Sequence, residues 1–160
     1  MSNTTPYRIL LVCLGNRVRS PLAQGFLRAE LDSAGQRDVV VASAGTHAWP
    51  GDEPPEREAV FEAARVGIDI AHLRSRALLP DDFGRFDAVL AMDWDSHALA
   101  TDLAPPEHRH RIGHLASHAR RHKITTIPDP QAEGYAHTLA CIEDACEGFV
   151  ARRLVRRAGR

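Results

Sequence analysis

The residues with the clearest chemical potential lie in one short stretch near the N-terminus, where Cys13 and Arg19 are separated by five residues. The apolar run 9–12 before them predicts a buried strand, and the helical spacing of apolar residues over 22–27 predicts a helix after them. A turn that leads into a helix N-terminus directs several backbone N–H groups to one point and binds anions there. The stretch therefore predicts a phosphate-binding loop that carries a nucleophile.

The other side chains of this turn suit the same chemistry. A helix N-terminus and a nearby guanidinium both favour the thiolate of Cys13, which is the reactive form of cysteine. The planar fork of Arg19 can hold two phosphate oxygens at once. Ser20 can donate a hydrogen bond to the sulfur, and Gly15 and Asn16 tolerate left-handed backbone. A lone cysteine at a strand end would be a small buried apolar residue, but that role does not require these neighbours.

The bulk properties describe an ordinary globular chain. Its 160 residues indicate one domain over 1–160, with 1–6 as a loose tail, and its net charge of −1 gives no general attraction to nucleic acid or an anionic membrane. Three cysteines make no disulfide framework and suit a reducing cytoplasm. The apolar run 9–14 is too short for a signal peptide or a membrane span. Five arginines after position 150 suit an exposed helix end.

Strand and helix patterns alternate along the chain. We expect strands at 7–12, 39–42, 86–92 and 112–115, and helices at 20–34, 56–66, 93–103 and 135–157. This alternation predicts an α/β fold with a parallel sheet and helices on both faces. Such sheets bind ligands at the carboxyl ends of their strands, where Cys13, Ser43 and Asp93 all fall. Residues 125–130 should be extended loop, because a residue that precedes proline avoids the α region.

The stretch Cys13-Leu14-Gly15-Asn16-Arg17-Val18-Arg19-Ser20-Pro21-Leu22-Ala23 resembles the signature of the low-molecular-weight protein tyrosine phosphatases. Further matching pieces are Ser43-Ala44-Gly45-Thr46 with Trp49, Gly67-Ile68-Asp69, Phe86-Asp87 through Ala91-Met92-Asp93, and Asp129-Pro130. They occur in the family's order and cover nearly the whole chain. The resemblance implies a single domain with a four-stranded parallel sheet. It also implies phosphomonoester hydrolysis through a cysteinyl-phosphate intermediate, without a cofactor or metal.

The resemblance also implies roles for individual residues. Cys13 would be the nucleophile, Arg19 the phosphate clamp, and Asp129 the general acid and then the general base. The phosphate-binding loop would comprise Leu14, Gly15, Asn16, Arg17, Val18 and Ser20. Ser43 and His72 would support it, although the histidine could align one residue away. An Asp-Pro pair also suits an ordinary turn, but a placed acid contributes about 10²–10⁴ in rate.

Three positions depart from the family pattern. Val18 replaces a second cysteine found in many relatives, so no disulfide with Cys13 can form there. Arg17 replaces the aliphatic residue of tyrosine-directed members or the threonine of the arginine-phosphatase branch; it could be a cation at the substrate rim or point to solvent. The tyrosines that often follow the Asp-Pro pair are missing. The aromatic rim would then rest on Trp49, which could equally anchor its loop, and on Tyr135.

Other functions remain open from the sequence. An arsenate reductase uses the same fold and loop, but it needs further cysteines after the third strand, where this chain has 93–96 without one. A phosphoarginine-directed phosphatase and a non-catalytic anion-binding module are further alternatives. His110, His114, His118 and His122 would share a face on one helix, but the segment begins as a strand, so we expect no metal site. The expected partner is a phosphotyrosine protein, such as a bacterial tyrosine kinase, acted on by a monomer or weak dimer.

Overall fold

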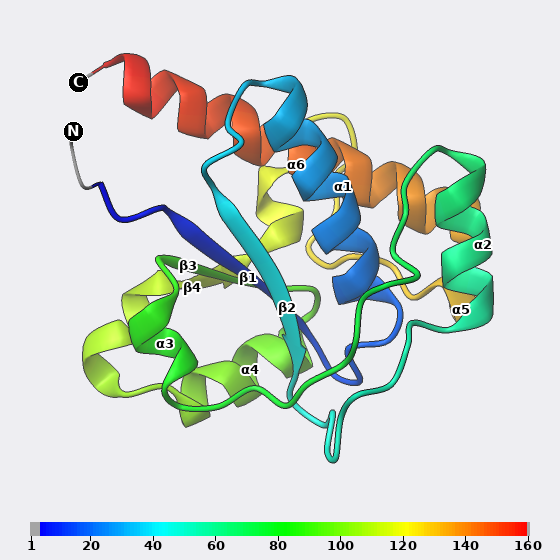
Figure 1. The fold of residues 1–160 in the computed structure, drawn as a ribbon, viewed down its shortest axis with the longest axis horizontal. Coiled ribbons are helices and arrows are strands. Elements are labelled where there is room, and N and C mark those ends of the chain that lie inside the picture. Colours follow the sequence, from blue (N-terminus) through cyan, green and yellow to red (C-terminus); the bar gives the residue numbers. More distant parts are fainter. Residues whose placement is uncertain (1–3, 160) are drawn as a thin grey trace.

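The four predicted strands form one parallel sheet (Figure 1). The computed structural model describes residues 4–159, so half of the expected loose tail, 1–3, lies outside the described residues. The strands are β1 (Arg8–Cys13), β2 (Val40–Gly45), β3 (Ala88–Ala91) and β4 (Ile112–His114), in the spatial order β2-β1-β3-β4. Every neighbouring pair is parallel. The carboxyl ends of all four strands therefore lie along one edge.

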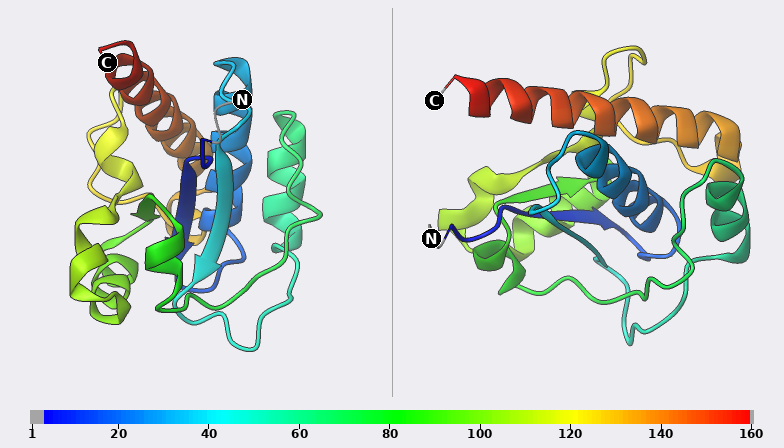
Figure 2. Two further views of the ribbon diagram at one scale, coloured as in Figure 1. Left: turned by 60° about the vertical axis from the view of Figure 1, so that its left-hand side comes forward. Right: turned by 45° about the horizontal axis from the view of Figure 1, so that its top comes forward.

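Helices cover both faces of the sheet, as the alternating pattern predicts (Figure 2). The α-helices are α1 (Arg19–Ser33), α2 (Arg57–Arg65), α3 (Asp82–Arg85), α4 (Trp94–Leu103), α5 (Pro130–Glu133) and α6 (Tyr135–Ala158). Two 3₁₀ helices, η1 (Pro106–Arg111) and η2 (Leu115–His118), flank β4. Helices α1, α2 and α6 pack on one face and α3 and α4 on the other. Strand β1 is buried on both sides because Ile9 and Leu11 face the first layer while Leu10 and Val12 face the second.

The ends of α1 show how local sequence sets helix boundaries. The start was predicted wrongly: Val18 is the N-cap, the helix begins at Arg19, and Ser20 lies inside the first turn. The predicted stop at Gly35 is confirmed. Its φ is 72°, its N–H donates to Asp32, and the next N–H donates to Leu31, which is the pattern of a left-handed C-terminal cap. Because α1 starts early, the Ser20 hydroxyl is free to face the phosphate-binding loop.

Helix α4 begins with the cap that the sequence predicts. Asp93 is the N-cap, its carboxylate accepts from the Ser96 N–H at 2.8 Å, and the Ser96 hydroxyl completes a reciprocal capping box. The predicted extended segment before Pro130 is also present, since Asp129 has φ −75° and ψ 122°. It ends at once in the short helix α5, which was not predicted.

The long helix α6 crosses the molecule (Figure 1), and near its C-terminal end Arg153 packs over the ring of Tyr7, just before β1. The buried residues of α6 lie between Tyr135 and Val150, whereas Leu154 is exposed. The four regularly spaced histidines do not share a helix, because they lie in η1, β4, η2 and the loop that follows. Among residues 4–159, none of the helices combines the length and apolar character needed to cross a membrane.

Candidate active site

The loop between β1 and α1 holds the Cys13 sulfur between two hydrogen-bond partners. The Asn16 N–H donates to Sγ at 3.2 Å, and the Ser20 hydroxyl lies 2.9 Å from it. Cys13 is buried, and Asn16 takes the left-handed conformation, with φ 56°. When the sulfur is a thiolate it can only accept, so Ser20 must then be the donor. The loop thus places a buried sulfur at a helix N-terminus, where negative charge is stabilised.

The side chain of Asn16 ties this loop to the sheet. Its amide nitrogen donates to the hydroxyls of Ser20 at 2.8 Å and Ser43 at 3.0 Å. Its carbonyl oxygen accepts from the Arg76 N–H at 3.0 Å. Ser43 in turn donates to the side chain of Gln24 at 2.7 Å. Because Asn16 is buried and both amide hydrogens are used, the network fixes the conformation that aims its N–H at the sulfur.

His72 lies outside this network, contrary to the sequence analysis. Its ring is mostly exposed, and Nδ1 lies 3.9 Å from the Asp69 carboxylate. In this network the backbone N–H of Arg76 donates to the Asn16 oxygen, and the side chain of Gln24 accepts from Ser43. Gln24 was missed, although it follows Ser20 by one helical turn and therefore lies on the same face of α1.

Arg19 is positioned by Asp93. The sequence predicts that Asp93 lies at the sheet edge, but it does not indicate a contact with the arginine. One guanidinium nitrogen donates to the Asp93 carboxylate at 2.7 Å and another donates to the Ile127 carbonyl at 3.0 Å. Burial alone would raise the pKa of Asp93, but hydrogen bonds from Ser96 and the Arg19 guanidinium outweigh it and hold that pKa below 3.8. Asp93 is therefore a fixed carboxylate that caps α4 and orients Arg19.

The end of β2 docks directly against the loop. The Thr46 and His47 N–H groups donate to the carbonyls of Cys13 and Leu14 at 3.0 and 2.8 Å. A Cβ on Gly45 would lie 2.7 Å from the Leu14 carbonyl oxygen, so only glycine permits this approach. Trp49 follows on the same connection and is 85% exposed. Its indole therefore stands free on a segment anchored to the loop.

Asp129 lies on a connection that is held to α6. Its exposed carboxylate accepts from the Gln131 N–H through Oδ1 at 2.9 Å, which leaves Oδ2 free. The neighbouring Pro128 carbonyl accepts from the Thr138 hydroxyl at 3.0 Å, and Pro130 is buried. The backbone on both sides is thus fixed while one carboxylate oxygen remains available.

Tyr135 does not form the exposed rim that the sequence analysis expected. It is 8% exposed at the start of α6, and its buried hydroxyl has no hydrogen-bond partner within residues 4–159. Burial, followed by the carboxylates of Glu58 and Glu56, raises its pKa to about 12. Tyr135 is the first residue of α6 and packs inward with the other buried residues of that helix.

Arg17 neither points freely to solvent nor stands alone at the rim. Its Nε donates to the Pro54 carbonyl at 3.1 Å and lies 3.8 Å from the Glu53 carboxylate. Its own carbonyl accepts from the Glu56 N–H at 2.9 Å. Arg17 therefore joins the phosphate-binding loop to segment 53–56 on the way to α2.

The three cysteines have different environments. All are free, and Cys141 and Cys146 are buried in α6. Burial raises the pKa of both thiols, so the reactive thiolate is disfavoured at each. Neither is placed to act as an accessible second thiol, and the structure gives no support to the arsenate reductase alternative.

The Cys13 sulfur, which accepts from the Asn16 N–H, and Arg19, which is held by Asp93, flank the turn from β1 to α1 at the carboxyl edge of the parallel sheet, where such sheets bind ligands. The family described as low molecular weight phosphotyrosine protein phosphatase matches residues 8–158. The chain belongs to this family.

Relatives and solved structures agree over almost the whole chain. A low molecular weight protein-tyrosine-phosphatase of Streptomyces coelicolor is 33% identical over 154 residues, which is 91% of this chain and 92% of the relative. A crystal structure of a protein tyrosine phosphatase from Entamoeba histolytica superposes with a TM-score of 0.89 at 25% identity, over 94% of this chain and 99% of that one. YfkJ from Bacillus subtilis gives 0.88 at 25% identity, over 97% and 99%. These matches confirm the predicted family and fold.

Proposed function

We propose that the protein hydrolyses phosphotyrosine in proteins, and aryl phosphomonoesters, through a phosphate ester of Cys13. The observation that carries this is the sulfur at the base of the loop, with Ser20 at 2.9 Å and the Asn16 N–H at 3.2 Å. The tyrosine kinase proposed as a partner would present a phosphorylated tyrosine of its own. The three free cysteines suit a reducing cytoplasm, which is the proposed location.

The first step transfers the phosphoryl group to the enzyme. The Cys13 thiolate attacks phosphorus, the S–P bond forms and the P–O bond to tyrosine breaks. The electron pair leaves with the phenolic oxygen, which takes a proton from the Asp129 carboxyl group. A phenolate is a poor leaving group, with a pKa near 10, so this proton is worth about 10²–10⁴ in rate.

The second step releases phosphate. The Asp129 carboxylate takes a proton from water, whose oxygen attacks phosphorus. The S–P bond breaks and its electron pair returns to Cys13 as a thiolate. The Ser20 hydroxyl, already within hydrogen-bond distance, stabilises the leaving sulfur by donating to it.

Arg19 would hold the phosphoryl oxygens during both steps. A guanidinium has five N–H donors. One is used by Asp93 and one by the Ile127 carbonyl, so three remain for the substrate. Asp93 acts through Arg19 and is a positioning residue.

Steady-state hydrolysis of a phosphotyrosine peptide, a phosphoarginine substrate and two aryl phosphates tests the proposal. We expect Cys13→Ser to lose about 10⁴-fold or more in kcat. Asp129→Ala should impair the aryl phosphate with the poorer leaving group more than the one with the better leaving group. A kcat of Cys13→Ser close to that of the native protein would refute the mechanism, and equal effects of Asp129→Ala on both esters would remove Asp129 as the acid. Faster hydrolysis of phosphoarginine than of phosphotyrosine would redirect the substrate assignment.

A further inference from the structure

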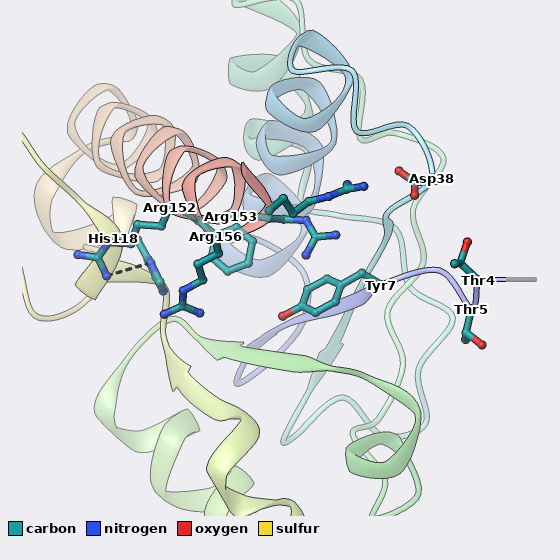
Figure 3. Close-up of a pocket in the computed structure, with 10 residues that line it drawn as sticks. Thr4, Thr5, Tyr7, Asp38, His118, Arg152, Arg153 and Arg156 are labelled. Carbon is teal, nitrogen blue, oxygen red and sulfur yellow. Dashed lines mark hydrogen bonds between the residues drawn. The ribbon is translucent and has the colours of Figure 1, made fainter. Parts of the chain in front are cut away.

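A cavity of about 370 Å³ lies near the N-terminal ends of the strands, away from the phosphate-binding loop (Figure 3). Tyr7, just before β1, and Asp38, just before β2, line it, whereas Cys13 ends β1 at the other edge. Pockets for small ligands usually measure about 300–1,000 Å³. The cavity is therefore large enough for a small molecule and is separate from the catalytic site.

Arginines of α6 dominate the lining of this cavity. They are Arg152, Arg153, Arg156 and Arg157. Figure 3 shows the first three projecting from α6, with Arg152 next to His118. Within residues 4–159, no carboxylate makes a salt bridge with any of the four, and Asp38 is the only acidic residue in the lining. Like charges one helical turn apart repel, so four arginines beside a single carboxylate leave the lining with an excess of positive charge.

Arg153 carries an unfulfilled hydrogen-bonding group in this lining. Its guanidinium lies over the Tyr7 ring, 4.0 Å from the centroid, which fixes its position. Its Nε is buried and has no acceptor among the described residues. A helix C-terminus attracts cations and accounts for arginines at that end. This attraction does not explain why the buried Nε–H of Arg153 has no acceptor beside the cavity.

His118 lies partly buried in this lining, next to two of the arginines. Burial, followed by Arg152 and Arg156, lowers its pKa to about 4. The ring is thus neutral at pH 7, and Nδ1 lies 3.4 Å from the Arg152 guanidinium, which can only donate. Nε2 then carries the proton and is a further donor on this wall. The lining offers donors and positive charge almost exclusively.

We propose that this cavity is a second anion-binding site, which takes a small ligand with two linked phosphoryl groups. One arginine fork can match a single phosphate. Four guanidinium groups, with the Tyr7 hydroxyl beside them, match the greater charge and length of a diphosphate. Free pyrophosphate and the diphosphate group of a nucleotide share this chemistry.

Titration of the ¹⁵N-labelled protein, followed by amide NMR shifts, tests the site. We expect pyrophosphate to shift the amides of Tyr7, Asp38, His118 and Arg153 with one Kd below about 1 mM at low ionic strength. The amide of Asn16 reports binding at the catalytic loop separately. Orthophosphate should bind the cavity about tenfold or more weakly. Shifts confined to the catalytic loop would overturn the proposal.

Paired variants separate a built site from general charge attraction. Arg152→Gln with Arg156→Gln should weaken pyrophosphate binding at the cavity about tenfold or more, because two charged donors are lost. The single variant Arg156→Gln should weaken it less, and the melting temperature checks that each variant folds. Arg85→Gln with Lys123→Gln removes the same charge from exposed positions elsewhere and should leave binding unchanged. Equal weakening by both pairs would show non-specific attraction and refute the site.

Two further ligands identify the source of the anion. Adenosine diphosphate that binds at least as tightly as pyrophosphate would support the proposal and assign the site to nucleotides. Weaker binding of adenosine diphosphate than of pyrophosphate would support it and assign the site to free pyrophosphate. A poly-glutamate peptide that binds where pyrophosphate does not would overturn the proposal in favour of an acidic protein segment.

Discussion

The two ends of the sheet organise polar groups in opposite ways. At the carboxyl edge, the Asn16 side chain has a partner for its oxygen and for both amide hydrogens, and Arg19 is held by Asp93 and Ile127. At the other end, arginines surround a cavity without a paired carboxylate, and Arg153 keeps a buried N–H without an acceptor within 4–159. At the carboxyl edge, the polar groups that shape the loop have their hydrogen-bond partners before a substrate binds. At the other end, the positive charges and the buried N–H would gain their partners from a bound anion. The two sites therefore differ in how many of their polar groups are bonded within the protein.

We expect oxidation to have the largest effect on activity, because the catalytic edge offers no second thiol to protect the nucleophile. Peroxide converts an accessible thiolate to a sulfenic acid and then irreversibly to a sulfinic acid, unless a nearby thiol captures the first product. Val18 offers no thiol, and the other two cysteines are buried in α6. We expect complete loss of activity in peroxide and poor recovery with dithiothreitol.

Val18→Cys provides the matched comparison for oxidation. The added thiol should permit a disulfide with Cys13, and reduction should then restore most of the activity. Aryl phosphate hydrolysis before and after reduction measures the difference. Full recovery of the unaltered protein would contradict this explanation.

Removing the centre of the saturated network should cost the most stability. Asn16→Ala leaves the Ser20 and Ser43 hydroxyls and the Arg76 N–H without their partner, and it places alanine at a φ of 56°. We expect a loss of about 3 kcal/mol in the free energy of unfolding, together with a lower kcat. Urea denaturation measures the first quantity. Ser43→Ala removes fewer hydrogen bonds and should lower the free energy of unfolding by about 1 kcal/mol. An equal loss in both variants would show that Asn16 contributes no more to stability than Ser43.

The ion pair at the catalytic edge should affect activity more than stability. Asp93→Asn retains a capping oxygen but loses the charge that holds Arg19, so we expect kcat/KM to fall about 10–100-fold. Asp95→Asn, an exposed change in the same turn of α4, should leave kcat/KM unchanged. A comparable fall in Asp95→Asn would show that helix charge, and not the ion pair, was responsible.

The pH dependence of this ion pair has a definite sign. The pKa of Asp93 is lower in the folded protein than its ordinary 3.8. Its stabilising contribution is therefore complete above about pH 3.8 and is lost as the pH falls through the folded pKa. The difference in unfolding free energy between the native protein and Asp93→Asn should be constant from neutral pH to about pH 5 and shrink at more acidic pH.

The smallest expected effect is a change in the pKa of His118 at the arginine cavity. Replacing Arg152 and Arg156 with glutamine removes two of the causes that hold the pKa of His118 near 4, while burial, the largest cause, remains. We expect the pKa to rise part of the way toward 6.5, measured by NMR titration of the imidazole ring. The Arg85→Gln and Lys123→Gln pair should leave it unchanged. An unchanged pKa of His118 in the arginine variant would show that the cavity is less positive than its lining indicates.

The sheet and the catalytic loop were predictable because their patterns are local. Continuous apolar runs indicate strands buried on both faces, and the spacing from Cys13 to Arg19 places a loop at a helix start. Gly35 follows a helix end because, without a Cβ, it tolerates a positive φ, and Asp93 caps a helix start through its carboxylate. Each of these features depends on residues a few positions apart.

The position of His72 could not be predicted in the same way. Arg76 forms a two-pronged ion pair with buried Asp82, and its carbonyl accepts from Gly45 across the sheet edge. These contacts fix the register of the segment so that the Arg76 N–H faces Asn16 and His72 stays outside. The short helices α3 and α5, with four residues each, are set by similar tertiary contacts, because so short a helix has little stability of its own.

Helix α6 runs from the connection that carries Asp129 to the arginine cavity. Its 24 residues form a rod about 36 Å long. The Asp129 connection is tied to one end through Thr138, and the arginines project from the other. In between, Gly148 lies so close to the His118 carbonyl that any side chain there would clash, so only glycine permits this packing of α6. One helix therefore contributes both to the connection that carries Asp129 and to the lining of the arginine cavity.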